Sequence, residues 1–237
     1  FHSISAFCNA GIDILGADSF AAYARNPLIN LTTMILIVAG GIGYTVWFDI
    51  TDNIRNFRKK GERRRGMFKI LTLNSKVALT MTAILIVTGT VSFLFLEFSN
   101  QDTLGEFSFG DKVMGAAFQS VTTRTAGFFT VPQGDLREES VFISCLLMFI
   151  GGSPAGTAGG VKTTTIAMLF LTAVTVVKGN KDTECFGRRI PEENIRTGIS
   201  VMLMSFTILM IGTIAVSVID RRDFLIFCLR RPRQLEQ

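Results

Sequence analysis

Two short segments of this sequence share a pattern that ends in glycine and suits coordination of a cation by backbone oxygens. They are Phe1–Ile12, with the letters FHSISAFCNAGI, and Phe118–Phe128, with the letters FQSVTTRTAGF. Both begin with Phe, Ser and an aliphatic residue and end with Ala-Gly and an apolar residue, with a one-residue slip between. A cation that leaves water must recover its hydration from oxygen atoms, and converging backbone carbonyls supply them. The repeated segment therefore predicts a cation filter.

The glycine of each segment is central to this prediction. Gly11 and Gly127 can take conformations that strain other residues, which lets the chain turn its carbonyls inward. The helix expected before each filter would point its C-terminal end, with its partial negative charge, at the cation. The alternative is that these glycines only permit close helix packing, which is common in membranes. The predicted filter residues are Asn9, Ala10, Gly11, Ile12, Thr125, Ala126, Gly127 and Phe128, with the carbonyls of Asn9, Ala10, Thr125 and Ala126 as candidate ligands.

The composition places these segments in a membrane protein. Of the 237 residues 48% are hydrophobic and only 18% are charged, with 21 Phe, whereas a soluble domain carries about a quarter charged residues. Several uncharged apolar stretches reach the roughly 17–25 residues that span a bilayer. These stretches are Asn26–Phe48, Val77–Leu96, Ser140–Val161 and Thr197–Ile219, with a further run at Thr163–Val177.

Charge predicts the topology. The segment 51–74 holds eight basic and two acidic residues, which the positive-inside rule places in the cytoplasm. The segment 97–111 holds four acidic residues and no basic one, as expected outside. The basic residues follow hydrophobic spans and lack interleaved aromatics, so the net charge of +5 indicates membrane topology and not nucleic-acid binding.

One apolar stretch does not fit a simple span. Lys112–Val131 is too polar to cross and must begin and end on the outside. The simplest solution is a re-entrant loop, a short helix that dips into the membrane and returns as extended chain. Such backbone is tolerated only where protein or water satisfies its polar groups, so the loop indicates a pore.

The last part of the repeat must contain a break. Ser140–Val177 has 38 residues, about 57 Å as one helix, which far exceeds a hydrocarbon core of about 30 Å. Pro154 and five glycines place the break at Gly151–Gly160, where a flexible segment below the filter could obstruct or open the path. A passive kink is the alternative, although ten consecutive poor helix formers exceed what a kink needs. The predicted gate residues are Gly151, Gly152, Ser153, Pro154, Gly156, Thr157, Gly159, Gly160 and the ionisable Lys162.

These motifs resemble the Trk/Ktr/HKT superfamily of potassium transporters, most of all the bacterial Ktr-type membrane subunit. The resemblance rests on Ser5–Gly11, on Ser120–Phe128 and above all on Gly151–Thr165, GGSPAGTAGGVKTTT. It implies an all-α polytopic membrane protein with repeated span, pore loop and span units around a potassium-channel-like pore, here incomplete at both ends. It also implies that the intramembrane loop gates conduction. The implied partners are the lipid bilayer, a second copy in a homodimer and a cytosolic nucleotide-binding ring docked on the basic cytoplasmic surfaces, all in the bacterial cell membrane.

The resemblance also divides the chain. Residues 1–50 would hold the filter and second span of the second repeat, and 51–75 a basic cytoplasmic loop. Residues 76–178 would form the complete third repeat, with pore loop 111–128 and broken span 140–177. Residues 179–219 would be a cytoplasmic loop and the first span of the fourth repeat. Because the sequence begins at Phe1 without an initiator Met, we expect residues upstream.

Other functions have weak support in the sequence. Four scattered cysteines and one histidine do not suggest a metal site. Gly156–Thr163 looks like a phosphate-binding loop, but its glycine spacing fails and it lies within a span. We therefore expect no enzyme and no cofactor, with potassium as the substrate. Two alternatives stay open: a truncated remnant that inserts but does not conduct, and a membrane enzyme or unrelated permease.

The C-terminal segment 220–237 conflicts with the predicted topology, because its five arginines would lie outside. The family continues here into a fourth pore loop with a Phe-Glu-x-x-Ser-Ala-x-Gly-Thr-like sequence. One choice of codons for Cys228–Gln237, read in a shifted frame, encodes Phe-Glu-Ala-Ala-Ser-Ala-Ile-Gly-Thr. We therefore expect a frameshift near Phe227, after which the residues are not family sequence and have no folded role.

Overall fold

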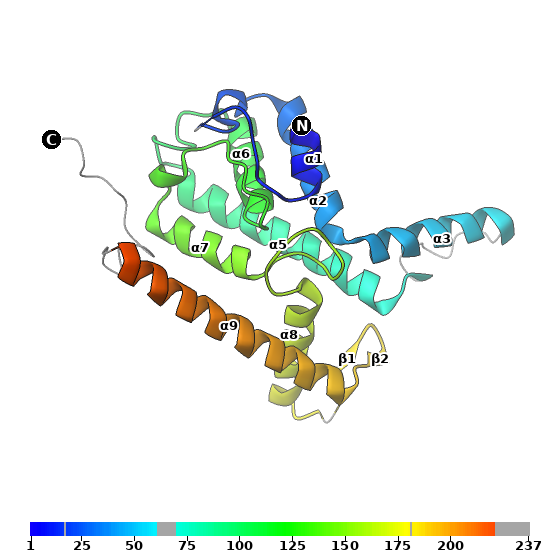
Figure 1. The fold of residues 1–237 in the computed structure, drawn as a ribbon. Helices are drawn as coiled ribbons and strands as arrows, with labels where there is room; N and C mark the ends of the chain where they lie inside the picture. The colour runs from blue at the N-terminus through cyan, green and yellow to red at the C-terminus, as the bar shows by residue number, and fades with distance from the viewer. Residues whose placement is uncertain (17, 61–69, 181, 221–237) are drawn as a thin grey trace.

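The computed structural model describes residues 1–16, 18–60, 70–180 and 182–220, and it is built almost entirely of helices (Figure 1). In chain order the elements are α1 (His2–Phe7), η1 (Ala21–Tyr23), α2 (Pro27–Ile42), α3 (Tyr44–Lys60), α5 (Leu73–Glu97), α6 (Phe109–Thr122), η2 (Gln133–Asp135), α7 (Glu138–Phe149), α8 (Thr163–Val177), β1 (Glu184–Cys185), β2 (Arg188–Arg189) and α9 (Glu192–Asp220). The helical fold class predicted from the sequence is confirmed. Of the predicted C-terminal tail 220–237, only Asp220 is described, so the segment Cys228–Gln237 that is expected to follow a frameshift lies outside the described residues.

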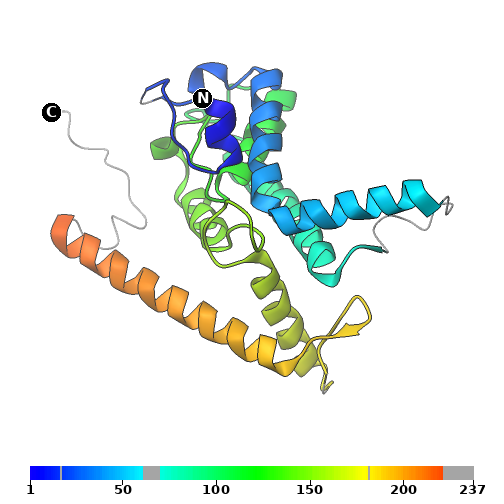
Figure 2. The same ribbon diagram turned by 45° about the vertical axis from the view of Figure 1, so that its right-hand side comes forward.

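Helix α5 is the centre of the bundle and packs against α6, α7, α8 and α3. With 25 residues and a strongly apolar middle, it is long and apolar enough to cross a membrane, and its N-cap Thr72 accepts a hydrogen bond from the N–H of Ser75. Helix α9 is the second element of this kind among the described residues, over Glu192–Val216. Its N-terminal part lies beside α8, and its apolar side chains are mostly exposed (Figures 1 and 2).

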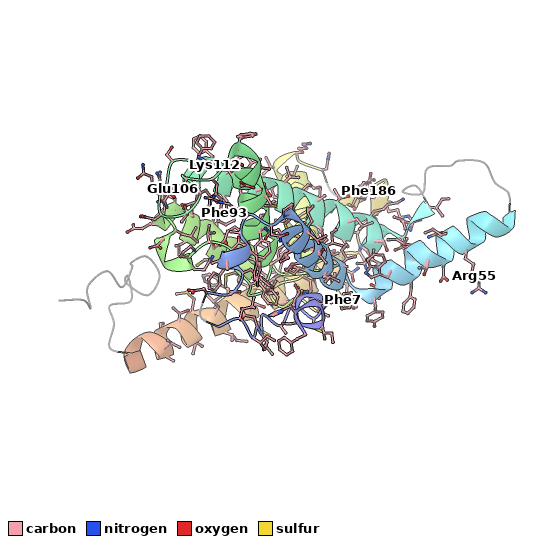
Figure 3. The ribbon with its side chains drawn as sticks, turned by 90° about the horizontal axis from the view of Figure 1, so that it is seen from above. Phe7, Arg55, Phe93, Glu106, Lys112 and Phe186 are labelled. Atoms are coloured by element: carbon pink, nitrogen blue, oxygen red, sulfur yellow. The ribbon has the colours of Figure 1, made fainter. Side chains whose placement is uncertain are left out.

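The predicted span Asn26–Phe48 is built of two helices that meet at a bend. The start of helix α2 is stabilised, because the Asn26 side chain accepts hydrogen bonds from the N–H groups of Leu28 and Ile29 and Pro27 occupies the first turn. It ends at Ile42, and α3 continues from Tyr44 at an angle of 92°. The bend lies at Gly43 (φ 91°), so the apolar run continues in sequence but not in direction. Helix α3 projects from the bundle, and Figure 3 shows Arg55 on this projecting part. Part of the predicted basic loop 51–75 is therefore helical.

The predicted span Ser140–Val161 is not one continuous helix, and its interruption includes the predicted break at Gly151–Gly160. Helix α7 ends at Phe149 and α8 begins at Thr163, and residues 150–162 between them are not helical. Pro154 and the glycines of this stretch are poor helix formers, which accounts for the interruption.

The start of α7 is fixed by a buried carboxylate from α5. Glu97 Oε1 accepts the N–H of Arg137, the N-cap of α7, over 2.8 Å. Glu97 Oε2 accepts hydrogen bonds from Asn100 Nδ2 over 2.6 Å and from Thr103 Oγ1 over 2.7 Å. The Glu97 side chain is only 1% exposed, so one acidic group joins the end of α5, the following turn and the beginning of α7.

A small apolar core joins the two copies of the repeated segment. Ala6 comes from the first copy, and Phe118, Ala126 and Phe128 come from the second. They pack together with Met34 and Ile37 of α2 and with Phe20, whose ring centroid lies 5.1 Å from that of Phe128. Helices α1 and α6 both pack against α2, so this core holds the two short helices together.

Candidate functional site

The two predicted filter segments, residues 9–12 and 125–128, have the same backbone pattern. Asn9 (φ 50°) and Gly11 (φ 63°) lie in the left-handed region in the first copy, and Thr125 (φ 68°) and Gly127 (φ 89°) do so in the second. These residues occupy equivalent places in the repeat. A left-handed Thr is unusual because its branched side chain crowds the backbone. The recurrence of this pattern in both copies supports their structural equivalence.

Each segment directly follows a short helix. Helix α1 ends in a Schellman arrangement, in which the N–H of Asn9 bonds the Ala6 carbonyl over 3.1 Å and the N–H of Ala10 bonds the Ser5 carbonyl over 3.0 Å. Helix α6 ends at Thr122, and the N–H of Ala126 returns to the carbonyl of Thr122 over 2.9 Å. The C-terminal ends of both helices, which carry partial negative charge, therefore lie next to the filter segments.

The two filter glycines touch. A Cβ atom built on Gly11 would lie 2.9 Å from the Cα of Gly127 and 2.7 Å from the carbonyl oxygen of Ala126. A Cβ atom built on Gly127 would lie 2.9 Å from the Cα of Gly11. Real Cβ atoms do not approach this closely, so glycine is required at both positions for this contact.

The carbonyl groups of the filter segments fall into two classes. Among the described residues, the carbonyls of 9–11 and 125–127 accept no hydrogen bond. The carbonyls of Ile12 and Phe128 do accept one, from Ser5 Oγ over 2.7 Å and from Thr122 Oγ1 respectively. Backbone carbonyls without a partner in folded proteins are uncommon, so the first class is available for a cation. The predicted ligands Asn9, Ala10, Thr125 and Ala126 belong to it.

The predicted gate residues all lie in one loop that closes on itself. Ile150 and Val161 form a parallel bridge, and the N–H of Gly152 bonds the carbonyl of Gly159 over 3.1 Å. A Cβ atom on Gly151 would lie 1.5 Å from the carbonyl oxygen of Gly159, so only glycine allows the two ends of the loop to cross. The closing contacts make residues 150–162 a compact unit.

This loop contacts both filter segments through side chains. Thr157 Oγ1 accepts a hydrogen bond from Asn9 Nδ2 over 2.7 Å and donates to the carbonyl of Phe7 over 3.0 Å. The N–H of Gly159 donates to Thr125 Oγ1 over 2.9 Å. Asn9 and Thr125 are the equivalent left-handed residues of the two copies, so the loop binds each copy at the same point.

The loop also binds the end of α2. The N–H of Ser153 bonds the carbonyl of Gly41 over 2.9 Å, and the N–H of Thr157 bonds the carbonyl of Gly40 over 3.2 Å. The N–H of Tyr44, at the start of α3, bonds the carbonyl of Ala155 over 3.2 Å. The bend between α2 and α3 therefore lies against the loop.

The other predicted gate residues stabilise the loop without reaching the filter. Lys162 Nζ donates to the carbonyl of Ala158 over 3.0 Å, at the start of α8. Ser153 Oγ and Thr163 Oγ1 are 3.2 Å apart and both fully buried. Within the predicted gate set, Thr157 and Gly159 form hydrogen bonds to the filter segments.

Sequence reasoning missed three features of this site. The hydroxyls of Ser5 and Thr122 bind the filter segments. Their equivalent places in the repeat were a signal that could have identified them. Gly40 and Gly41 bind the loop through backbone carbonyls, which residue type does not reveal. Arg124 is 4% exposed and its Nη2 lies 3.4 Å from Thr82 Oγ1 of α5, so this cation beside the second filter segment is buried.

The chemistry of the site is that of neutral oxygen atoms. Backbone carbonyl groups come from the two segments, and the hydroxyl groups of Thr125 and Thr157 join those segments to the loop. Over the described parts of the chain, no group of three or more His, Cys, Asp or Glu side chains could hold a metal ion. Neutral oxygens in converging segments suit a weakly hydrated monovalent cation that must bind and leave.

Comparison with known proteins gives a consistent result. The family model described as TrkH, cation transport protein, matches residues 1–227. The "Ktr system potassium uptake protein B" of Bacillus subtilis is 36% identical over 225 residues, which cover 95% of this chain and 48% of that protein. The "Potassium/sodium uptake protein NtpJ" of Enterococcus hirae is 34% identical over 220 residues, covering 93% of this chain and 46% of that protein. The chain thus spans about half the length of these relatives.

A solved structure shares the fold. The crystal structure of the potassium transporter TrkH from Vibrio parahaemolyticus superposes with a TM-score of 0.69 at 21% sequence identity. The match covers 90% of this chain and 44% of the other. At this level of identity the likeness concerns the arrangement of the helices alone.

Proposed function

This chain belongs to the TrkH family of cation transport proteins, and from that premise we propose that it forms part of a transmembrane pathway for potassium ions. The observation that carries the proposal is the contact between Gly11 and Gly127. It brings together two equivalent segments whose carbonyls at 9–11 and 125–127 have no partner within the described chain. Such oxygens replace the hydration shell of a potassium ion. Further pore segments, implied by the family resemblance, would complete the ring around the ion.

The proposed gate is the loop 150–162. It forms hydrogen bonds to Asn9 and Thr125, the first residues of the two filter segments. A loop in this place restricts passage while its bonds are made and permits it when they break. The loop also bonds the start of α3, so movement of α3 on the predicted cytoplasmic side would reach the loop directly.

Potassium is the proposed substrate, with sodium as the competing ion. One relative carries potassium in its name and another carries both potassium and sodium. Carbonyl oxygens at fixed spacing select by ion size and by field strength, so the relative flux of the two ions is the property that the filter geometry controls.

The proposed setting is the bacterial cell membrane, crossed several times by the chain. Its proposed partners are the lipid bilayer, a second copy of the same subunit and a cytosolic nucleotide-binding ring that docks on the basic segment 51–74. The relative from Bacillus subtilis is named as protein B of a Ktr system, which supports the idea of further subunits. No nucleic acid is proposed, because the basic residues follow the predicted topology.

The test is transport by the product of the natural gene. We would purify it, reconstitute it in liposomes and measure potassium and sodium fluxes down imposed gradients, with protein-free liposomes as the control. Potassium flux above the control, with a clear preference over sodium, is the expected result. Flux equal to that of protein-free liposomes would overturn the proposal and favour the inactive-remnant alternative, which neither the fold nor the comparisons support.

A further inference from the structure

Two hydroxyl groups, one in each copy of the repeated segment, bind the filter at the same place. In the first copy Ser5 Oγ donates to the carbonyl of Ile12 over 2.7 Å and accepts the N–H of Ile12 over 3.0 Å. In the second copy Thr122 Oγ1 donates to the carbonyl of Phe128. Both are buried, with exposed fractions of 6% for Ser5 and 7% for Thr122. The acceptor in each copy directly follows the filter glycine.

The same two residues also bind the chain before the glycine. The carbonyl of Ser5 accepts the N–H of Ala10 over 3.0 Å, and the carbonyl of Thr122 accepts the N–H of Ala126 over 2.9 Å. Ser5 and Thr122 therefore hold the filter segment on both sides of its glycine. Between these anchoring points the carbonyls remain without a hydrogen bond from the described residues.

The equivalence survives a difference in chain length. Residues 6–8 separate Ser5 from the left-handed Asn9, whereas only residues 123–124 separate Thr122 from the left-handed Thr125. The one-residue slip of the repeat thus lies between the hydroxyl residue and the filter. Both hydroxyls nevertheless bind the carbonyl of the residue that follows the filter glycine in their own copy. The interaction is therefore a shared feature of the two copies and not a result of identical spacing.

These two hydroxyls differ from others at helical positions. Thr123 Oγ1 donates back to the carbonyls of Gln119 and Ser120 in its own helix, both over 3.0 Å. This back-bonding is the usual choice for a hydroxyl on a helix. Ser5 and Thr122 instead reach forward to the returning chain. Their bonds fix the orientation of a peptide group outside the helix.

We infer that Ser5 and Thr122 are positioning residues that set the outer end of the ion filter. Each hydroxyl turns the carbonyl of Ile12 or Phe128 toward its helix. The carbonyls that face the ion are thereby limited to those of 9–11 and 125–127. This inference rests on the proposed function and refines it, because it removes the carbonyls of the predicted filter residues Ile12 and Phe128 from those that face the ion and assigns their orientation to two hydroxyls.

The experiment compares three variants of the natural gene product in potassium-uptake-deficient bacteria and in liposomes. Thr122→Val removes the hydroxyl and keeps the shape, Thr122→Ser keeps the hydroxyl, and Thr123→Val removes a neighbouring buried hydroxyl that does not touch the filter. We expect Thr122→Val to lower the potassium-over-sodium flux ratio about tenfold, which corresponds to about 1.4 kcal/mol. Thr122→Ser and Thr123→Val should keep the ratio, and immunoblots should show normal membrane levels.

Ser5→Ala gives an independent reading in the other copy and decides the matter if Thr122→Val does not reach the membrane. An unchanged flux ratio in Ser5→Ala, or an equal loss in Thr123→Val, overturns the inference. Gly127→Ser in the same assay separates this failure from a failure of the proposed function. If Gly127→Ser alters selectivity and the hydroxyl variants do not, the filter stands and the positioning role is wrong. If none alters selectivity, the proposed filter itself is wrong.

Discussion

Gly11 and Gly127 are in direct backbone contact, because a Cβ atom built on either would lie 2.9 Å from the Cα of the other. The two residues come from different copies of the repeat, and each has a positive φ. Neither copy can therefore change at this position without displacing the other.

Gly127→Ser should impair selection between ions. The serine would have to adopt the left-handed conformation, which costs an L-residue about 1–2 kcal/mol, and its Cβ would displace the first copy. We expect the potassium-over-sodium flux ratio to fall by about tenfold or more, measured in liposomes. Gly134→Ser is the control, since nothing lies within 4 Å of a Cβ at that position. Unchanged uptake and selectivity in Gly127→Ser would remove this residue from the permeation path.

The contact between the copies also predicts coupling. Gly11→Ala and Gly127→Ala should each lower the flux ratio, but the double variant should lose much less than the sum of the two single effects. Residues in contact commonly show interaction free energies of about 0.5–3 kcal/mol in such a cycle. Simple additivity of the logarithms of the ratios would contradict the contact.

Thr157→Val should raise ion leak through the closed protein. The substitution keeps the size of the side chain and removes the hydroxyl that joins Asn9 to the Phe7 carbonyl. Loss of this link destabilises the closed loop by about 1–2 kcal/mol, so basal potassium flux should rise about tenfold. Thr164→Val, in α8 just beyond the loop, serves as the control. Wild-type leak from Thr157→Val at normal membrane levels would show that the loop does not restrict flow.

Gly151→Ala should prevent the loop from closing. Its Cβ would lie 1.5 Å from the Gly159 carbonyl oxygen, and relief of such overlap costs about 1–3 kcal/mol or more. We expect a lower Tm in detergent and a lower membrane level. Gly212→Ala, in the open part of α9 with no atom within 4 Å of its Cβ, should keep the Tm or raise it. Equal Tm values for the two variants would be incompatible with the observed crossing of the loop.

Glu97→Ala should destabilise the end of the bundle where α5 meets α7. It would leave the donors of Asn100, Thr103 and Arg137 without their acceptor, at a cost of roughly 3 kcal/mol. The Tm should fall by several degrees, whereas the exposed Glu106, labelled in Figure 3, should tolerate alanine. An unchanged Tm for Glu97→Ala would show that the buried carboxylate has no structural role.

The sequence predicted the parts of the site that depend on residue type. Glycine and proline have local conformational effects, so the turns at Gly11 and Gly127 and the break near Pro154 were accessible from the letters alone. The bend at Gly43 could not be predicted, because the surrounding residues stay apolar and hydropathy does not indicate where a helix changes direction. Likewise, the bonds from the loop to Gly40 and Gly41 use backbone carbonyls that every residue possesses. The hydroxyls of Ser5 and Thr122 were visible in the repeat, but their forward bonds depend on how the chain returns.

The broken helix pair has a consequence for biogenesis. At 1.5 Å per residue α7 is about 18 Å long and α8 about 22 Å, and neither spans a hydrocarbon core of about 30 Å. Neither segment is therefore long enough to leave the translocon as an independent transmembrane helix. Both pack against α5, which is synthesised before them and is long enough to insert alone. We therefore expect α5 to act as an intramolecular template, so that a nascent chain whose α5 fails to insert leaves α7 and α8 at the membrane surface as substrates for quality-control proteases.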